Sequence, residues 1–186
     1  GDVIHALPVS YAIKERFPEA HLTWVVEKPA YPILEDNPYI DEIILFEKAK
    51  FRSIGGFLRE IGPFRRRLRV RRYDASLDLQ GLFKSAAIAF NAGAKLRIGT
   101  ANMREGAHLV SRPVRGAHAE GHIVERYLDV ARALGCVVRE VRFPVAVSAR
   151  DAAAADTLLM REGVQEGRRF VAFAIGANWP NKRWPV

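Results

Sequence analysis

Three polar side chains lie where a parallel α/β fold would gather them around a ligand. Asp2 follows Gly1 at the predicted start of a helix, where a carboxylate either caps the helix or faces a bound molecule. Gln80 and Lys84 flank a glycine turn between a predicted strand and the next helix, so both can reach a ligand at the same sheet edge as Asp2. Taken singly, Asp2 is typical of a helix cap and Lys84 of an exposed lysine.

A second set of residues could bind phosphate or carboxylate groups. Arg104 lies in a loop-rich stretch, where a guanidinium can hold such a group through two hydrogen bonds, although a surface ion pair is the simpler interpretation. Further on, a loop with Asn178 follows a predicted strand and leads to Lys182 and then Pro185, which suits the first turn of a helix. This order predicts a cradle for a diphosphate. The sequence matches neither the P-loop pattern nor the HExxH, GxSxG and CxxC motifs, and no spacing predicts a metal site.

Positive charge is concentrated in one segment of the chain. The chain carries 29 Lys and Arg against 21 Asp and Glu, a net charge of +8. Residues 48–72 alone contribute +9, because Glu60 is the only acid there. Such a segment can bind nucleic acid, an anionic membrane surface or an acidic substrate, or can be a solvated helix face. Nucleic acid is disfavoured, because no nucleic-acid-binding motif accompanies the charge and few aromatic residues lie within it.

Length and composition exclude several classes of protein. A chain of 186 residues suffices for one domain of roughly 100–200 residues and at most part of a second. The hydrophobic fraction of 49% supports a packed core and excludes a disordered chain. The single cysteine, Cys136, excludes a disulfide framework and fits a reducing compartment. No apolar run approaches the ~18–20 residues that cross a bilayer.

Strands alternate with helices along the chain, a pattern that predicts a parallel α/β sheet with right-handed crossovers. We expect strands at residues 21–27, 42–46, 75–79, 95–99 and 169–175, and helices at residues 2–16, 30–35, 83–91, 118–134 and 149–162. Residues 52–72 should be helical in pieces, broken at Gly55-Gly56 and at Gly62-Pro63, and residues 100–117 should form loops. Because the first helix opens directly at residues 1–2, we expect a strand, within roughly ten further residues, to precede it.

Three blocks of sequence, taken in order, resemble the lipopolysaccharide heptosyltransferases of glycosyltransferase family 9. They are residues 1–8 (GDVIHALP), 77–86 (LDLQGLFKSA) and 182–185 (KRWP), with residues 24–27 (WVVE) in addition. The second block favours the type I members, and the likeness covers essentially the whole chain. It implies an α/β fold of the GT-B type, in which two Rossmann-like domains enclose the active cleft. Residues 1–165 would be the N-terminal acceptor-binding domain without its first strand, and residues 166–186 the truncated beginning of the nucleotide-sugar domain.

The resemblance also implies a reaction and the residues that perform it. Members transfer L-glycero-D-manno-heptose from ADP-heptose to a Kdo sugar of the lipopolysaccharide inner core, with inversion and without an essential metal or other cofactor. By similarity, Asp2 matches the catalytic base that takes the proton of the attacking Kdo hydroxyl. Lys182, together with Asn178, matches the group that binds the donor diphosphate. The residues that match the acceptor side are Lys84, Gln80, Arg104 and, by a looser alignment, Lys48, Lys50 and Arg52.

The implied partners are ADP-heptose, Kdo-lipid A and the anionic surface of the bacterial inner membrane, with no nucleic acid. The enzyme would be cytoplasmic and peripheral on the inner face of that membrane. Because most of the nucleotide-sugar domain lies outside the printed sequence, we expect these 186 residues alone to be inactive. Two alternatives stay open. One is heptosyltransferase II or another family 9 transferase with a different donor, and the other is a basic module that binds nucleic acid or a membrane surface.

Overall fold

The computed structural model describes residues 2–165, 167–177 and 179–184. The chain divides into two compact units, Gly1–Ala146 and Val147–Val186. This division lies upstream of the domain boundary predicted after Gln165, which stays a prediction.

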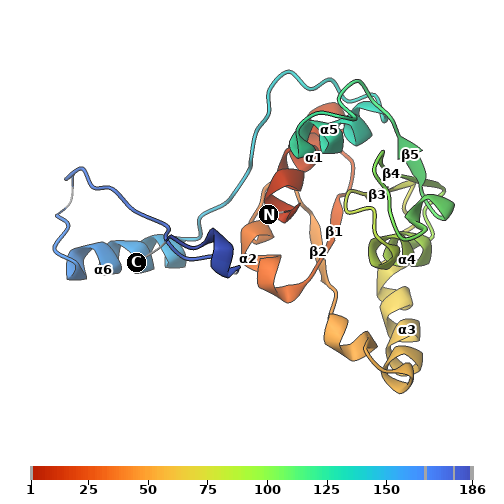
Figure 1. Cartoon of the computed structure of the whole chain (residues 1–186), viewed down its shortest axis with the longest axis horizontal. Helices are drawn as coiled ribbons and strands as arrows, with labels where there is room; N and C mark the ends of the chain where they lie inside the picture. The colour runs from red at the N-terminus through yellow and green to blue at the C-terminus, as the bar shows by residue number, and fades with distance from the viewer. Residues whose placement is uncertain (1, 166, 178, 185–186) are drawn as a thin grey trace. The chain divides into compact units, whose positions relative to one another are not determined.

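The larger unit is built on parallel strands (Figure 1). β1 (Thr23–Val26) pairs with β2 (Glu42–Leu45), while β3 (Ala75–Asp78) pairs with β4 (Leu96–Thr100), which in turn pairs with β5 (Arg112–Val114). Every pairing is parallel, as the alternation of strands and helices predicts. The strands form two sheets rather than one, because no ladder joins β1 to β3 among the described residues. β5 lies in the stretch expected to be loop, and its three residues include a proline, which hides a strand from sequence patterns.

Helices connect and cover these strands. They are α1 (Asp2–Arg16), α2 (Tyr31–Leu34), α3 (Ile54–Leu68), α4 (Phe83–Ala92) and α5 (Ile123–Arg132). Three short 3₁₀ helices lie between them, η1 (Lys28–Ala30), η2 (Lys48–Phe51) and η3 (Ala107–Leu109). The contact between α1 and α5 forms the largest part of the core. α1 runs continuously through Pro8, whose buried ring packs in the core although it supplies no backbone N–H to the helix.

α3 is one continuous helix, so the prediction that residues 52–72 break at their glycines was wrong. Ser53 caps its start, since the hydroxyl oxygen accepts from the Gly56 N–H at 3.1 Å. Near its end, Phe64 and Leu68 are buried in a cluster with Ile44 of β2. Packing and capping therefore outweigh the weak helix propensity of the Gly62-Pro63 pair.

α5 begins five residues later than predicted, because residues 118–122 fold back onto the helix. The backbone N–H of His118 donates to Asp129 at 2.8 Å, and Arg132 donates to the same carboxylate at 2.8 Å. Gly116 makes this approach possible, since a Cβ there would lie 2.3 Å from the Asp129 carboxyl carbon. Burial disfavours the charged form of Asp129, but the hydrogen bonds from His118 and Arg132 outweigh it and hold the pKa of Asp129 below its usual range.

The smaller unit contains α6 (Ala149–Arg161) and η4 (Pro180–Lys182). The Ser148 hydroxyl caps α6 by accepting from the Asp151 N–H at 3.0 Å. The strand predicted at residues 169–175 is not formed, which corrects the sequence-based expectation. Its large apolar side chains are exposed, and a strand needs a neighbouring strand that the described part of this unit does not supply.

Asp129→Asn should lower the free energy of unfolding by about 1–3 kcal/mol at neutral pH, because it deprives the His118 N–H and the Arg132 guanidinium of a buried, charged acceptor. Since the pKa of Asp129 is lowered on folding, this contribution is complete above the unfolded carboxyl pKa of about 3.9. It is lost as the pH falls through the lower folded value. Urea unfolding at neutral and acidic pH measures the difference. An equal loss in Asp74→Asn, which changes an exposed carboxylate of the same unit, would contradict this role.

Candidate functional site

A cavity of about 580 Å³ lies between β1 and β3 and is bounded by α1 and α4. Most of its wall is apolar side chains of the two strands and of the helices. Polar or charged side chains line it where β1 and β3 end and where α1 and α4 begin, among them Asp2, Glu27, Gln80 and Lys84. The structure thus brings together three of the residues predicted from the sequence at the edge where parallel sheets bind ligands.

Asp2 lies in the first turn of α1, inside the helix rather than at the capping position. Its carboxylate is exposed and lines the cavity, as does Tyr127 of α5. Burial raises the pKa of Tyr127, and the nearby charges of Asp2 and Asp78 raise it further. The phenol is therefore a neutral hydrogen-bond donor close to the Asp2 carboxylate over the whole physiological pH range.

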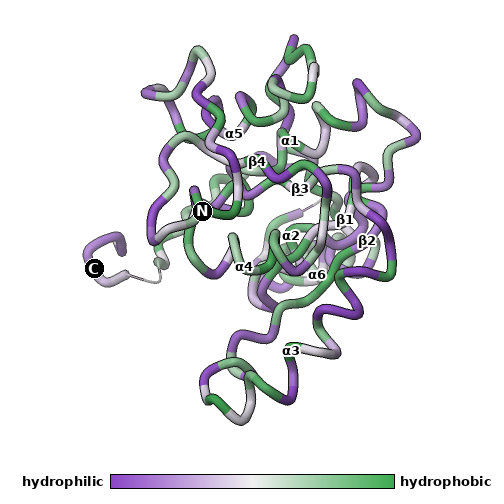
Figure 2. Tube along the Cα trace, turned by 90° about the vertical axis from the view of Figure 1, so that its right-hand side faces the viewer, coloured by the Kyte–Doolittle hydropathy of each residue, from purple (hydrophilic) through white to green (hydrophobic). Residues whose placement is uncertain are grey.

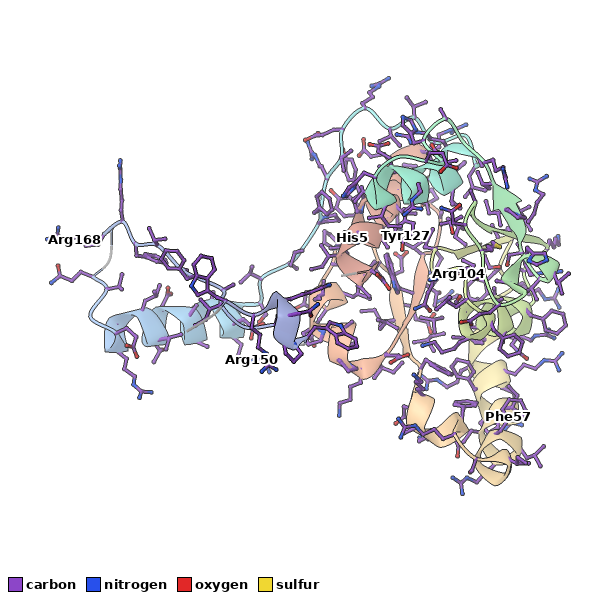
Figure 3. All side chains as sticks on the ribbon, in the orientation of Figure 1. His5, Phe57, Arg104, Tyr127, Arg150 and Arg168 are labelled. Atoms are coloured by element: carbon purple, nitrogen blue, oxygen red, sulfur yellow. The ribbon has the colours of Figure 1, made fainter. Side chains whose placement is uncertain are left out.

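His5 lies one turn beyond Asp2 on α1. At this level α1 contacts α5 and the residue before it, His122. The His5 ring contacts the ring of His122 edge to face, with centroids 6.1 Å apart. Figure 3 shows His5 on α1 beside α5, which carries Tyr127. Nδ1 of His5 is buried and has no hydrogen-bond partner among the residues that the structure describes. The α1–α5 contact therefore fixes the direction in which the first turn of α1 presents Asp2.

Lys84 is held by an ion pair rather than lying free on the surface. Its ammonium group donates to the carboxylate of Glu27, the residue that directly follows β1. The same ammonium lies 5.9 Å from the centre of the Phe46 ring. The ion pair therefore connects the first turn of α4 to the end of β1 across the cavity. The Lys84 and Glu27 side chains are partly exposed, so solvent screens part of their attraction.

The turn between β3 and α4 has a geometry that only glycine adopts without strain. Gly81 has a φ of +66°, and a Cβ there would lie 3.2 Å from the Cα of Met103. Asp78, buried at the end of β3, accepts from the Gly81 N–H at 2.8 Å. The Gly81 carbonyl accepts from the Arg104 N–H at 2.8 Å. The turn that carries Gln80 is thus fastened to both β3 and the Arg104 loop.

Arg104 is placed by its backbone and by the residue that follows it. Glu105 has a left-handed φ of +55°, and its carboxylate accepts from the Phe83 N–H, at the start of α4, at 3.2 Å. The Arg104 side chain is exposed and does not line the cavity. The loop nevertheless fixes Arg104 beside the turn that carries Gln80 and beside the helix that carries Lys84 (Figure 3).

The remaining predicted site residues lie elsewhere. Lys48 and Lys50 are on η2 and Arg52 follows it, and none of the three lines the cavity. A hydrogen bond from Lys50 to Glu47 raises the pKa of Lys50. Lys182 is on η4 of the smaller unit, where its N–H donates to the Trp179 carbonyl at 3.0 Å. Asn178 is outside the described residues, and in the described ranges no cluster of three His, Cys, Asp or Glu residues could hold a metal ion.

Comparison with known proteins decides the family. Residues 61–186 match glycosyltransferase family 9 (heptosyltransferase), which is more than half of the chain. The chain belongs to this family.

Relatives in glycosyltransferase family 9 are similar along most of the chain. The chain is 28% identical to the lipopolysaccharide core heptosyltransferase OpsX of Haemophilus influenzae, over 86% of the chain and 44% of that protein. It is 29% identical to lipopolysaccharide heptosyltransferase 1 of Pseudomonas aeruginosa, over 100% of the chain and 52% of that protein. The solved structure of the ADP-heptose lipopolysaccharide heptosyltransferase II of E. coli superposes with a TM-score of 0.69 at 25% identity, over 100% of the chain and 54% of that structure. The chain therefore spans about half the length of the relatives it matches, and its α/β fold is of the GT-B type that the family shares.

Sequence reasoning missed four residues that organise the site of this family 9 chain. Glu27 pairs with Lys84, Asp78 holds the turn, Tyr127 lies near Asp2 and Glu105 holds the Arg104 loop. Glu27 and Asp78 stand at or just after the ends of predicted strands, which is a usable signal. Tyr127 and Glu105 carry no such signal, because their roles depend on contacts between segments that are distant in sequence.

Gly81→Ala should destabilise the larger unit by about 1–2 kcal/mol, because the substitution forces a side chain into a left-handed conformation next to Met103. Urea unfolding measures the loss, and the NMR amide signals of Gln80 and Arg104 should shift. Gly62→Ala is the matched control, since nothing lies within 4 Å of a Cβ there and its φ is ordinary. The control should leave the fold as stable or up to about 1 kcal/mol more stable. Equal effects of the two substitutions would contradict this account of the turn.

Proposed function

We propose that this chain is the acceptor-binding half of a lipopolysaccharide heptosyltransferase. The enzyme would transfer L-glycero-D-manno-heptose from ADP-heptose to a Kdo residue of the inner core. Membership of family 9 and the names of its relatives support the reaction class. The single observation that carries the proposal is the exposed Asp2 carboxylate at the mouth of a cavity that Gln80 and Lys84 also line.

The proposed step is a direct displacement at the anomeric carbon of heptose. The Asp2 carboxylate accepts the proton of the Kdo hydroxyl as that oxygen bonds to the anomeric carbon. The bond from this carbon to the diphosphate oxygen breaks, and ADP departs with the electron pair. Lys182, with Asn178, would bind the diphosphate and stabilise its added charge. Because the acceptor attacks from the face opposite the leaving group, the configuration inverts, and a lysine can supply the positive charge that other transferases obtain from a metal ion.

The acceptor side of the proposal depends on positive charge. Kdo carries a carboxylate and lipid A carries phosphates, so basic side chains are the expected partners. Lys84 and Arg104 lie on segments fastened to the Gly81 turn, next to Gln80. Lys48, Lys50 and Arg52 lie on and after η2 and would contact the anionic parts of the acceptor farther from the reacting hydroxyl.

We also propose that the enzyme works at the cytoplasmic face of the bacterial inner membrane, where it would meet its glycolipid acceptor. No helix in the described part of the chain is long and apolar enough to cross a membrane. The positive charge of residues 48–72 supports an electrostatic association with an anionic membrane surface.

A second candidate is a family 9 transferase of type II or with a different donor. The E. coli heptosyltransferase II structure matches the whole chain, so similarity does not separate the types. An activity screen of the full-length enzyme distinguishes the type I, type II and other-donor transferases. The screen tests several nucleotide sugars as donors and acceptors that end in Kdo or in heptose. A basic nucleic-acid or membrane-binding module is the weaker alternative, because it leaves the polar cavity edge without a role.

Asp2→Asn in the full-length enzyme should lower kcat by about 10²–10⁴-fold, because the amide cannot accept the hydroxyl proton. Binding of ADP-heptose, followed by calorimetry, should not change. Glu19→Gln is the control, an exposed carboxylate beyond the far end of α1 that should leave turnover unaltered. Turnover by Asp2→Asn at the wild-type rate would refute the role of Asp2 as the base.

The 186 residues alone should give no turnover with ADP-heptose and a Kdo-lipid A acceptor, because the chain spans about half the length of its relatives. They should still bind the acceptor, which isothermal calorimetry with a soluble Kdo disaccharide can measure. Measurable turnover would contradict this prediction.

A further inference from the structure

η2 and the first half of α3 form a tip, residues 48–59, that projects from the larger unit. Figures 1 and 2 both show this end of α3 pointing away from the two sheets. The other end of α3 is anchored, since Phe64 and Leu68 are buried. η2 packs on the start of the helix, where a Cβ on Gly56 would lie 2.4 Å from the Lys50 carbonyl oxygen. The tip is therefore a fixed structural feature of the unit.

Large apolar side chains are exposed on this tip. Ile54 is 82% exposed, Leu58 is 68% exposed and Phe57 is 46% exposed. Figure 3 shows Phe57 at the projecting end of α3. Ile54 and Leu58 are four residues apart, so they lie one above the other on the same side of the helix. Two large apolar side chains on one side of a projecting helix form a small apolar surface that is available to an apolar partner.

Basic side chains surround the apolar stripe. Arg65, seven residues after Leu58, lies on the same side of α3 beyond the end of the stripe, and the alternation of hydrophobic and hydrophilic residues along α3 is visible in Figure 2. The exposed basic side chains of the tip and of the rest of α3 are Lys48, Lys50, Arg52, Arg59, Arg65, Arg66 and Arg67. Among ion pairs between described residues, only Lys50 with Glu47 and Arg59 with Glu60 neutralise members of this set.

We propose that the tip inserts Ile54 and Leu58 into an anionic lipid bilayer while the surrounding Lys and Arg side chains contact its phosphate groups. An apolar stripe bordered by basic residues is the pattern of helices that lie in the membrane interface. Each basic residue close to such a surface adds attraction, and arginine binds phosphate through two hydrogen bonds. The charge of the border selects a lipid surface over an apolar protein groove. This inference rests on the proposed function for the identity of the membrane and deepens it by naming the residues that make the contact.

The experiment measures binding of the 186-residue chain to lipid vesicles that contain no lipid A. Wild-type chain should sediment with phosphatidylglycerol-rich vesicles and bind pure phosphatidylcholine vesicles at least about tenfold more weakly. Ile54→Ser/Leu58→Ser should weaken binding to the anionic vesicles by about tenfold or more, because two exposed apolar side chains are lost. Val70→Ser/Leu109→Ser is the matched control, since these residues are 77% and 83% exposed outside the tip. It should bind like the wild type, and circular dichroism of all variants tests that the fold is kept.

Insertion of the tip into the bilayer can be measured separately from its binding affinity for the vesicles. An environment-sensitive fluorophore on Leu58→Cys should shift to shorter wavelength with anionic vesicles, whereas the same dye on Leu109→Cys should not. The native Cys136 is buried and does not compete for the label. Equal vesicle binding by wild type and Ile54→Ser/Leu58→Ser, absence of the shift, or equal binding to phosphatidylcholine would each overturn the proposal. A complex with a soluble protein in place of vesicle binding would overturn it as well.

Failure of this inference is distinguishable from failure of the proposed function. In the full-length enzyme, Ile54→Ser/Leu58→Ser should leave transfer to a water-soluble, delipidated acceptor unchanged, and Asp2→Asn should leave vesicle binding unchanged. Loss of transfer to the soluble acceptor in the tip variant would show that the tip belongs to the acceptor site instead.

Discussion

The packing of α1 against α5 is the contact on which the rest of the site depends. This packing buries the apolar side chains between α1 and α5. It thereby fixes the position of the first turn of α1, which carries Asp2, relative to the cavity. Asp129 of α5 stabilises this contact further. Its buried carboxylate accepts hydrogen bonds from the His118 N–H, in the segment that leads into α5, and from Arg132. Asp2 is therefore carried by a helix whose position is fixed along its length, which is what the proposed role of its carboxylate requires.

A second constraint joins loops that are distant in sequence. The Gly81 turn receives a hydrogen bond from Arg104, while Glu105 binds the first turn of α4. Two non-adjacent loops thus behave as one piece at the edge of the β3–β4–β5 sheet. The left-handed backbone of Glu105 costs free energy by itself, and such strain persists only where the surroundings hold it in place. Here the carboxylate's hydrogen bond to α4 is the compensating contact.

The fold class and part of the site could be predicted from the sequence. The predictions succeeded where a feature leaves a local sequence pattern and failed where it depends on packing between distant segments. β1, β2, β3 and β4 lie where the sequence predicts strands, because buried strands are rich in β-branched and aromatic residues, as in residues 21–27, or alternate apolar with polar residues, as in residues 75–79. The same logic failed for α3, where Phe64 and Leu68 supply packing energy that local propensity does not reveal. It failed again at residues 169–175, where a strand-like pattern has no neighbouring strand in the described part of its unit. In the site, Asp2, Gln80 and Lys84 follow from the rule for strand ends, whereas Tyr127 depends on the docking of a distant helix.

The ion pair between Lys84 and Glu27 has a consequence for selectivity. An anionic group that binds Lys84 has to displace the Glu27 carboxylate or share the ammonium group with it, and in either case the negative charge of Glu27 opposes its binding. A neutral sugar brings no charge of its own to compete with Glu27 and would leave the pair intact. A ligand with two or more negative groups recovers the cost by contacting other basic residues at the same time. The internal carboxylate therefore competes with every anionic ligand of Lys84, so a group with a single negative charge binds weakly there and a ligand with several negative groups is favoured over it.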